Sequence, residues 1–228
     1  MLLDVENTWS LGIARNGVRM KTPVNKQTLK QHFTYSWWKY LLIAALAFGL
    51  VDLLYTVTAY RVPSEKKVEF YVYGQINESG LQAYLDQVRE TELPEMEEVS
   101  CLQIIPDSAY GPMQLMTYLA AGEGDVYLLP HDEFVSYAME GALVPLENDE
   151  ELMALFNEAG INLQNGWRQQ TETGENHLCG IPQGKLPGLI NQYAYADDGY
   201  LCVSAVNGND ANVMRFLRIL CRDCISEK

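Results

Sequence analysis

The sequence predicts one N-terminal transmembrane helix followed by a single α/β domain, and three observations lead to this fold class. An apolar run occupies residues 40–60, and strand-like and helix-like segments alternate after it. The 228 residues are 48% hydrophobic and 20% charged, which is the composition of a folded chain rather than a disordered one. Alternating strands and helices predict a parallel sheet with helices on both faces, and therefore a three-layer domain.

Residues 1–39 show no clear periodicity and are predicted to form a flexible cytoplasmic tail. This segment holds six basic and two acidic residues, whereas residues 68–228 hold seven basic and 26 acidic residues. Basic residues next to a membrane helix favour the cytoplasmic side, so we expect the C-terminal domain outside the cell membrane. The acidity of that domain also argues against a nucleic-acid partner, because phosphates would be repelled.

The apolar run from Tyr40 to Tyr60 would form a helix of about 32 Å, which matches the hydrocarbon core of a bilayer. Trp37 and Trp38 precede it, at positions typical of interfacial aromatic anchors. We interpret the run as an uncleaved signal anchor in contact with lipid. A cleavable signal peptide is the alternative, since small residues near the end of the run offer a cleavage site.

Residues 61–67 are predicted to be a short polar linker, and the domain begins at residue 68. Its first strand is KVEFYVYG at 67–74, which is rich in Val, Phe and Tyr and ends at a glycine. Segment 77–93 carries apolar residues at helical spacing and is followed by Pro94, so it predicts a helix. EVSCLQIIP at 98–106 predicts the second strand.

YGPMQLMTYLAAGEG, at 110–124, predicts a helix with Pro112 in its first turn and glycines at its end. DVYLLP, at 125–130, predicts a strand that is buried on both faces. HDEFVSYAMEGAL, at 131–143, predicts the next helix. The glycines of GEGD follow a helix and precede a strand, the reverse of a dinucleotide-binding loop, so we interpret them as the end of the helix.

The remaining segments are less regular than the first half of the domain. They are predicted to be a helix at 149–161, a loop or hairpin at 163–177, a strand at 178–182, a glycine-rich connection at 183–199, a strand at 200–206, a turn at 207–210 and a terminal helix at 211–224.

Four quoted stretches carry a family resemblance: VEFYVYG, MTYLAAGEGDVYLLPHDEFVSYAMEGALVPLEND, HLCGIP and GYLCVSAVNGNDANVMRFLRIL. Their order resembles one lobe of the extracytoplasmic solute-binding proteins of ABC transporters, a type II periplasmic-binding-protein domain. The resemblance covers about residues 68–225. In that family a second lobe separates the last two stretches, but here residues 183–199 join them, which is too short for a lobe. The resemblance therefore implies one wall of a ligand cleft.

A binding surface is expected where parallel strands end, because ligands of open α/β sheets bind outside the carboxyl ends of the strands. The candidate ligand-binding residues at these ends are Tyr73, Gly74, Gln75, Asp107, Ser108, Tyr110, His131 and Asp132. Tyrosines are frequent among them, and tyrosine is suited both to ligand stacking and to a protein interface.

The sequence predicts no catalytic residue, no metal site and no cofactor, and we do not expect an enzyme. The histidines lack ligand spacing, and no serine lies in a nucleophile motif. Of the five cysteines, Cys101, Cys179 and Cys202 fall in predicted strands as buried small side chains. Cys221 and Cys224 form one C-x-x-C pair in or just after the terminal helix. The sequence is compatible with a disulfide bond there, and a single C-x-x-C pair is only weak evidence for a zinc site.

Two functions are consistent with these expectations. The first is a membrane-anchored, solute-binding-protein-like module that binds a small solute or a membrane subunit of an ABC transporter. The second is a non-enzymatic interaction protein whose exposed cleft wall docks a partner protein. A retained polar cleft favours the first function, and a large apolar patch on that wall favours the second.

Overall fold

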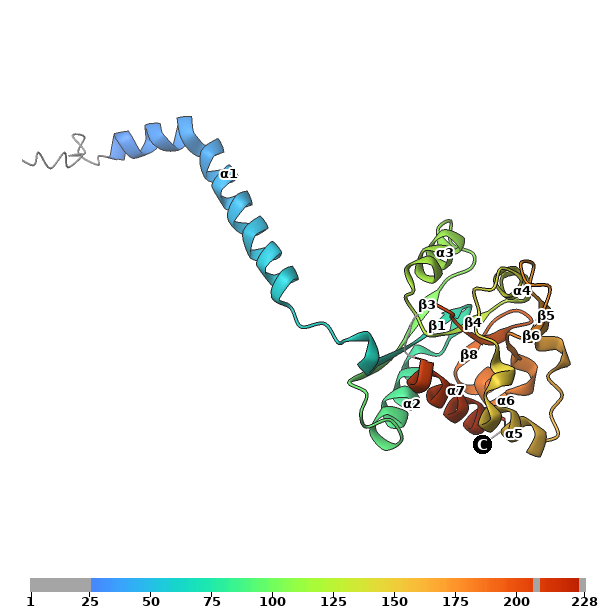
Figure 1. The fold of residues 1–228 in the computed structure, drawn as a ribbon. Coiled ribbons are helices and arrows are strands. Elements are labelled where there is room, and N and C mark those ends of the chain that lie inside the picture. Colours follow the sequence, from blue (N-terminus) through green and yellow to red (C-terminus); the bar gives the residue numbers. More distant parts are fainter. Residues whose placement is uncertain (1–25, 207–209, 226–228) are drawn as a thin grey trace, which may run out of the picture. The chain divides into compact units, whose positions relative to one another are not determined.

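The computed structural model describes residues 26–206 and 210–225, and the chain divides into two compact units, Met1–Tyr60 and Arg61–Lys228 (Figure 1). In the first unit, helix α1 spans Lys26–Thr58 and begins well before the predicted start at Tyr40. Part of the expected flexible tail is therefore helical. Residues 1–25 lie outside the described residues.

Helix α1 contains a 22-residue stretch, Trp37–Thr58, that is apolar and long enough to cross a membrane, a test that signal sequences also pass. Two threonine hydroxyl groups in this stretch are hydrogen-bonded within the helix. Thr56 donates to the carbonyl oxygen of Asp52 at 2.8 Å, and Thr58 donates to that of Leu54 at 2.6 Å. Internal hydrogen bonds of this kind make such a helix compatible with a lipid environment.

The second unit contains a five-stranded sheet with the order β3-β1-β4-β9-β7. The strands are β1 (Lys67–Tyr73), β3 (Glu98–Ile104), β4 (Val126–Leu129), β7 (Ile181–Pro182) and β9 (Tyr200–Val203). Strand β1 pairs in parallel with β3 and with β4, and Phe70 lies opposite Cys101 on one side and Val126 on the other.

The parallel arrangement predicted for the first three strands is confirmed by β1, β3 and β4, but the sheet as a whole is mixed. Strand β9 runs antiparallel to β4, and β7 runs antiparallel to β9. A parallel neighbour requires a crossover that carries the chain back to the starting end of the sheet. No such crossover separates β7 from β9, because residues 183–199 return the chain at the same end.

Two layers of helices cover the sheet (Figure 1). One face packs against α2 (Glu78–Thr91), α5 (Glu150–Glu158), α6 (Pro187–Gln192) and α7 (Asp210–Cys224). The other face packs against α3 (Gly111–Ala121) and α4 (His131–Met139). This arrangement is a three-layer α/β domain with a mixed sheet.

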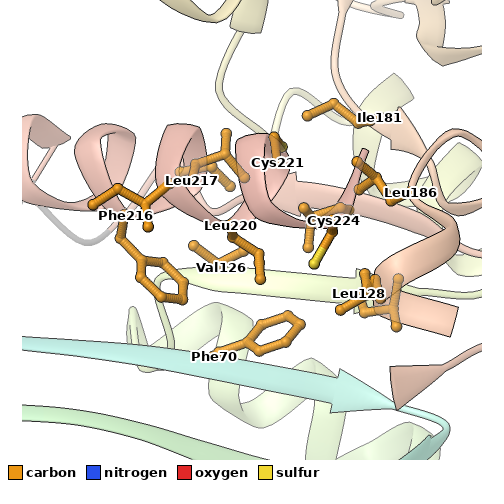
Figure 2. Packing of buried hydrophobic residues seen from close by; sticks show 14 of the residues in the cluster. Phe70, Val126, Leu128, Ile181, Leu186, Phe216, Leu217, Leu220, Cys221 and Cys224 are labelled. Carbon is orange, nitrogen blue, oxygen red and sulfur yellow. The ribbon is translucent and has the colours of Figure 1, made fainter. Parts of the chain in front are cut away.

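Alternation along the strands divides the core between the two faces. In β1, Phe70 and Val72 point to the α7 side, and Tyr71 and Tyr73 point to the α3 side. Figure 2 shows the first of these cores, where side chains of α7 pack onto β1 and β4 around Phe70 and Phe216.

The stretch AAGEGD joins α3 to β4, and its last residue, Asp125, is hydrogen-bonded to two neighbouring strand segments. Gly122 adopts a left-handed conformation with φ 68° and ends α3, which confirms the interpretation of these glycines as a helix end. Asp125 is buried, and its carboxylate accepts a hydrogen bond from the Glu69 backbone N–H at 2.7 Å. Its carbonyl oxygen accepts from the Ser204 N–H at 3.0 Å, so Asp125 links β1, β4 and the end of β9.

The predicted helices in the first half of the domain begin and end where local signals place them. The side chain of Asn77 accepts a hydrogen bond from Gly80 N–H at the start of α2, and Pro112 lies in the first turn of α3. Asp149 accepts from Leu152 N–H at 2.8 Å and starts α5 in the same way.

The segment that the sequence left as a loop or hairpin is a hairpin of β5 (Trp167–Gln169) and β6 (Asn176–Leu178). The single strand expected at 178–182 is divided between β6 and β7. The connection at 183–199 contains α6 and the short strand β8 (Ala194–Tyr195), which the sequence did not predict. The turn expected at 207–210 lies largely outside the described residues.

All five cysteines are free thiols. Cys221 and Cys224 lie within α7 and belong to the core on that face of the sheet. Cys202 is buried in β9, whereas Cys179 lies between β6 and β7 rather than in a strand. Burial raises the pKa of Cys179 to about 11 and that of Cys224 to about 12, so both thiols stay protonated at neutral pH.

His177 on β6 lies between two carboxylates. Its Nδ1 is 2.6 Å from Oε1 of Glu147, and its Nε2 is 3.4 Å from Oε2 of Glu175. The hydrogen bond that the His177 imidazole donates to the Glu147 carboxylate raises the pKa of His177 above the ordinary value of 6.5, and the negative charges of both carboxylates act in the same direction. The folded state therefore favours the protonated imidazole.

We expect His177 to stabilise the domain in acid and to lose this effect as the pH rises. A raised folded-state pKa gives a stabilisation that is complete below the unfolded pKa and is lost as pH rises through the folded pKa. Urea unfolding of the wild type and of His177→Gln, at about pH 5.5 and about pH 8.5, checks this. The stability difference should be larger at the lower pH, and a difference that grows with pH would contradict it.

Candidate functional site

Three parallel strands end at the same edge of the sheet, β1 at Tyr73, β3 at Ile104 and β4 at Leu129. The segments that follow them enclose a hollow of about 470 Å³. Its lining residues are Tyr73, Gly74, Gln75, Gln103, Ile105, Pro106, Asp107, Pro130, Glu133, Tyr195, Ala196 and Asp197.

A ladder between β2 (Gln75–Ile76) and β8 forms one wall of the hollow, and Gly74 permits its close approach. Gln75 pairs with Tyr195 across this antiparallel ladder. A Cβ atom at Gly74 would lie 2.2 Å from the carbonyl oxygen of Tyr195, which is well inside van der Waals contact. Only glycine therefore fits at the end of β1 while β8 stays in place.

A buried glutamine side chain is hydrogen-bonded to the backbone of the β8 wall. Gln183 is buried, and its Nε2 donates to the carbonyl oxygen of Ala194 at 2.7 Å. Its Oε1 accepts from the backbone N–H of Ala196 at 3.1 Å. Both ends of the buried amide are therefore hydrogen-bonded, and the backbone on either side of Tyr195 is tied to the Gln183 side chain.

Gln103 and Tyr73 form the side of the hollow next to the sheet. The Nε2 of Gln103 donates to the carbonyl oxygen of Gly74 at 2.8 Å and fixes the chain where it leaves β1. Tyr73 is 3% exposed. Burial raises the pKa of its hydroxyl group, and the negative charges of Glu133 and Asp107 raise it further. The phenol is therefore neutral at physiological pH.

The lining is acidic and partly aromatic. Asp107 follows β3, Glu133 lies in the first turn of α4, and Asp197 follows β8. The twelve described lining residues include no Lys, Arg or His. The side chain of Tyr195 is 45% exposed and presents an aromatic surface beside these carboxylates.

Four of the eight predicted site residues lie together in this hollow: Tyr73, Gly74, Gln75 and Asp107. The other four do not line it. Ser108 lies in the turn before α3, where its carbonyl oxygen accepts from Gly111 N–H at 3.2 Å. Tyr110 is 71% exposed at the start of α3. A ligand-binding role for each of the eight remains a prediction.

His131 and Asp132 lie at the start of α4 but do not line the hollow. The ring of His131 is 5.9 Å from the ring of Tyr200, and its Nδ1 is 3.2 Å from Oδ1 of Asp132. Successive side chains of a helix point about 100° apart, so the next residue, Glu133, reaches the hollow instead.

Sequence reasoning missed eight lining residues: Gln103, Ile105, Pro106, Pro130, Glu133, Tyr195, Ala196 and Asp197. Five of them, Gln103, Ile105, Pro106, Pro130 and Glu133, lie near the ends of β3 and β4. Their positions beside the predicted strand ends could have identified them from the sequence. Tyr195, Ala196 and Asp197 carried none, because the β2–β8 ladder that brings them to β1 is a long-range contact.

Comparison with known proteins gives a partial likeness in fold. No protein-family model matches the chain, and no curated protein matches it. An extracellular solute-binding protein of family 1 from Alicyclobacillus acidocaldarius is similar in structure, with 20% sequence identity, a TM-score of 0.35 and coverage of 54% of this chain and 28% of that one. An N-glycan transport solute-binding protein from Streptococcus pneumoniae shows 15% identity, a TM-score of 0.30 and coverage of 51% and 24%.

The chain thus spans about a quarter of the length of these two structures. Part of this chain is similar in structure to these solute-binding proteins. What the hollow itself offers is negative charge, hydrogen-bond acceptors and aromatic surface on a fixed backbone, which suits recognition of a ligand.

Proposed function

We propose that this protein is a membrane-anchored, extracytoplasmic binding module of solute-binding-protein type. Its α/β domain binds a small solute, or a membrane subunit of an ABC transporter, in the hollow at the carboxyl edge of the sheet. One observation supports this most directly: the ends of three parallel strands and the β8 wall enclose about 470 Å³. Ligand sites of open α/β sheets lie at this edge and have volumes of this order.

The hollow is partly open to solvent. A ligand held there keeps contact with solvent, since this domain supplies one wall and a two-lobed protein supplies two. We therefore propose weaker capture than in two-lobed proteins, with the affinity resting on the polar contacts of Tyr73, Gln103 and the carboxylates.

Helix α1 supports the proposed anchor and its orientation. Lys30 and Lys39 lie before or at the start of the apolar stretch, and basic residues on that side favour a cytoplasmic N-terminus. Protease treatment of intact cells would then remove the C-terminal domain. Survival of the domain in intact cells, with digestion after lysis, would contradict this orientation.

Thermal melting of the full chain in detergent, with a panel of sugars, amino acids, amines, short peptides and metal ions, tests the binding function. A ligand present at about a hundredfold excess over its Kd should raise Tm by about 5–10 °C, because it binds the native state alone. Tyr195→Ala should reduce the shift. Met139→Ala is the matched control, because Met139 on α4 is 42% exposed, close to the 45% of Tyr195, but does not line the hollow.

The melting experiment has three informative outcomes. A ligand-dependent shift that Tyr195→Ala reduces and Met139→Ala leaves intact supports binding in the hollow. A shift that both variants retain places the ligand elsewhere and contradicts this site. A cooperative transition that no member of the panel moves contradicts small-solute binding.

A second candidate function, docking of a partner protein, has one observation in its favour. Tyr110, Met113 and Met116 are all more than half exposed along α3. Exposed apolar side chains grouped on a helix are typical of interfaces. Replacement of both methionines by serine should abolish co-purification of a membrane partner with the full chain, and an unchanged set of partners would contradict this function.

A further inference from the structure

The charge of the hollow selects among ligand classes. Asp107, Glu133 and Asp197 come from three separate segments, after β3, on α4 and after β8, and all three line the same space. Glu133 also lies in the first turn of α4, where a carboxylate complements the helix dipole. That role does not account for Asp107 and Asp197, which lie outside any helix.

A second observation is independent of the carboxylates. Tyr73 is 97% buried, since 3% of its surface is exposed, and no hydrogen bond of its hydroxyl group occurs within the described residues. Among those residues, every fully buried side-chain oxygen and nitrogen has a partner. The Tyr73 hydroxyl therefore keeps a little contact with solvent, and Tyr73 lines the hollow together with Glu133 and Asp107, whose charges act on this hydroxyl. A buried phenol that keeps an open acceptor there is suited to receive a ligand N–H.

We propose that the hollow binds an organic cation, whose ammonium or guanidinium group is held by Asp107, Glu133 and the Tyr73 hydroxyl. This inference rests on the proposed binding function and names the ligand class of the same site. The cation donates hydrogen bonds to both carboxylates and to the phenol oxygen, and charge-assisted bonds of this kind are about twice as strong as neutral ones. Asp197 adds negative potential on the opposite wall.

The potential at the Tyr73 hydroxyl agrees with this assignment. After burial, the charges of Glu133 and Asp107 are among the causes that raise its pKa, so both carboxylates act on the point where the ligand would bind. A negative potential that disfavours a phenolate favours a bound cation for the same reason.

The apolar part of the lining favours an organic cation over a metal ion. Ile105, Pro106, Pro130 and the ring of Tyr195 line the hollow beside the carboxylates. They suit an aliphatic chain, and the tyrosine ring suits a cation placed over its face. Within residues 26–206 and 210–225, no group of three or more His, Cys, Asp or Glu side chains is placed to hold a metal ion.

Calorimetric titration of the full chain in detergent, with probes of equal chain length, tests the ligand class. The probes are pentane-1,5-diamine, pentane-1,5-diol and glutarate, with Mg²⁺ as an inorganic cation. We expect the diamine to bind at least about tenfold more tightly than the diol, and glutarate to bind least. A blocked lysine tripeptide distinguishes a lysine side chain from a free amine as the source of the cation.

Variants locate the effect. Glu133→Gln and Asp107→Asn should each weaken diamine binding by about tenfold, and Tyr73→Phe by about threefold. Glu140→Gln is the matched control, because Glu140 is an exposed carboxylate just after α4 that does not line the hollow. Circular dichroism melts of each variant separate a lost contact from a lost fold.

Failure of this inference differs from failure of the proposed function. If a neutral probe binds as tightly as the diamine and Tyr195→Ala abolishes that binding, the site stands and the cation assignment is overturned. Tighter binding of Mg²⁺ than of the diamine, or diamine binding that Glu133→Gln and Asp107→Asn leave unchanged, also overturns it. If nothing in the wider panel binds, both proposals are overturned.

Discussion

Replacement of Phe70 by alanine is expected to lower the unfolding free energy of the α/β domain by about 3–5 kcal/mol. Phe70 is fully buried at the centre of the sheet, in β1 between β3 and β4. Its ring lies 6.5 Å from that of Phe216 on α7, centroid to centroid, in the core that Figure 2 shows. Neighbours on two strands and a helix cannot all move inward, so the variant keeps most of the cavity.

Urea unfolding of the full chain in detergent, followed by circular dichroism, measures this loss. Met116→Ala is the control, because it also removes a large apolar side chain, but one that is exposed on α3 rather than buried. We expect the control to change stability by less than about 0.5 kcal/mol. A Phe70→Ala loss of the same size as the control would show that this core does not carry the stability of the domain.

Replacement of Gly74 by alanine is expected to destabilise the domain by about 1–3 kcal/mol or more and to distort the hollow. The added Cβ would lie 2.2 Å from the Tyr195 carbonyl oxygen, and that contact involves backbone rather than a movable side chain. The β2–β8 pairing and the buried amide of Gln183 hold the Tyr195 backbone in place. Relief of the clash therefore requires the β8 wall to move away from β1.

Gly184→Ala is the matched control for this substitution. Gly184 has no atom within 4 Å of an added Cβ atom and lies in the same domain. Alanine there should leave stability unchanged or raise it by about 0.4–1 kcal/mol, because it restricts the unfolded chain. Any ligand of the hollow should bind Gly74→Ala more weakly and Gly184→Ala normally. Equal stability and equal binding in the two variants would show that the wall adapts to the extra methyl group.

Local patterns in the sequence determined most of the elements in the first half of the domain. The helical spacing of Leu81, Leu85 and Val88 predicted α2, and these residues form its buried face. The apolar run VYLL predicted a strand covered on both faces, and β4 is fully buried. Such patterns succeed because strand and helix periodicity and helix-end signals act over a few residues.

Strand direction and the short elements of the second half depended on tertiary contacts. An apolar strand such as β9 has the same composition whether its neighbour is parallel or antiparallel, so the return path of the chain decided its direction. Helix α6 and strand β8 are short, at Pro187–Gln192 and Ala194–Tyr195, and short elements gain their stability from packing rather than from local propensity.

The residues of the candidate site also fall into two groups, those that local sequence patterns predicted and those that tertiary contacts placed. The sequence by itself determined that Tyr73, Gly74, Gln75 and Asp107 lie at or just after strand ends that meet at one edge, because parallel neighbours share their direction. Only the tertiary structure decided that Glu133, rather than His131 or Asp132, faces the hollow, because burial of Phe134 and Ala138 sets the rotation of α4. It alone also placed Tyr195 and Asp197 opposite β1, because that approach depends on a glycine at position 74 and a buried glutamine at position 183, far apart in the chain.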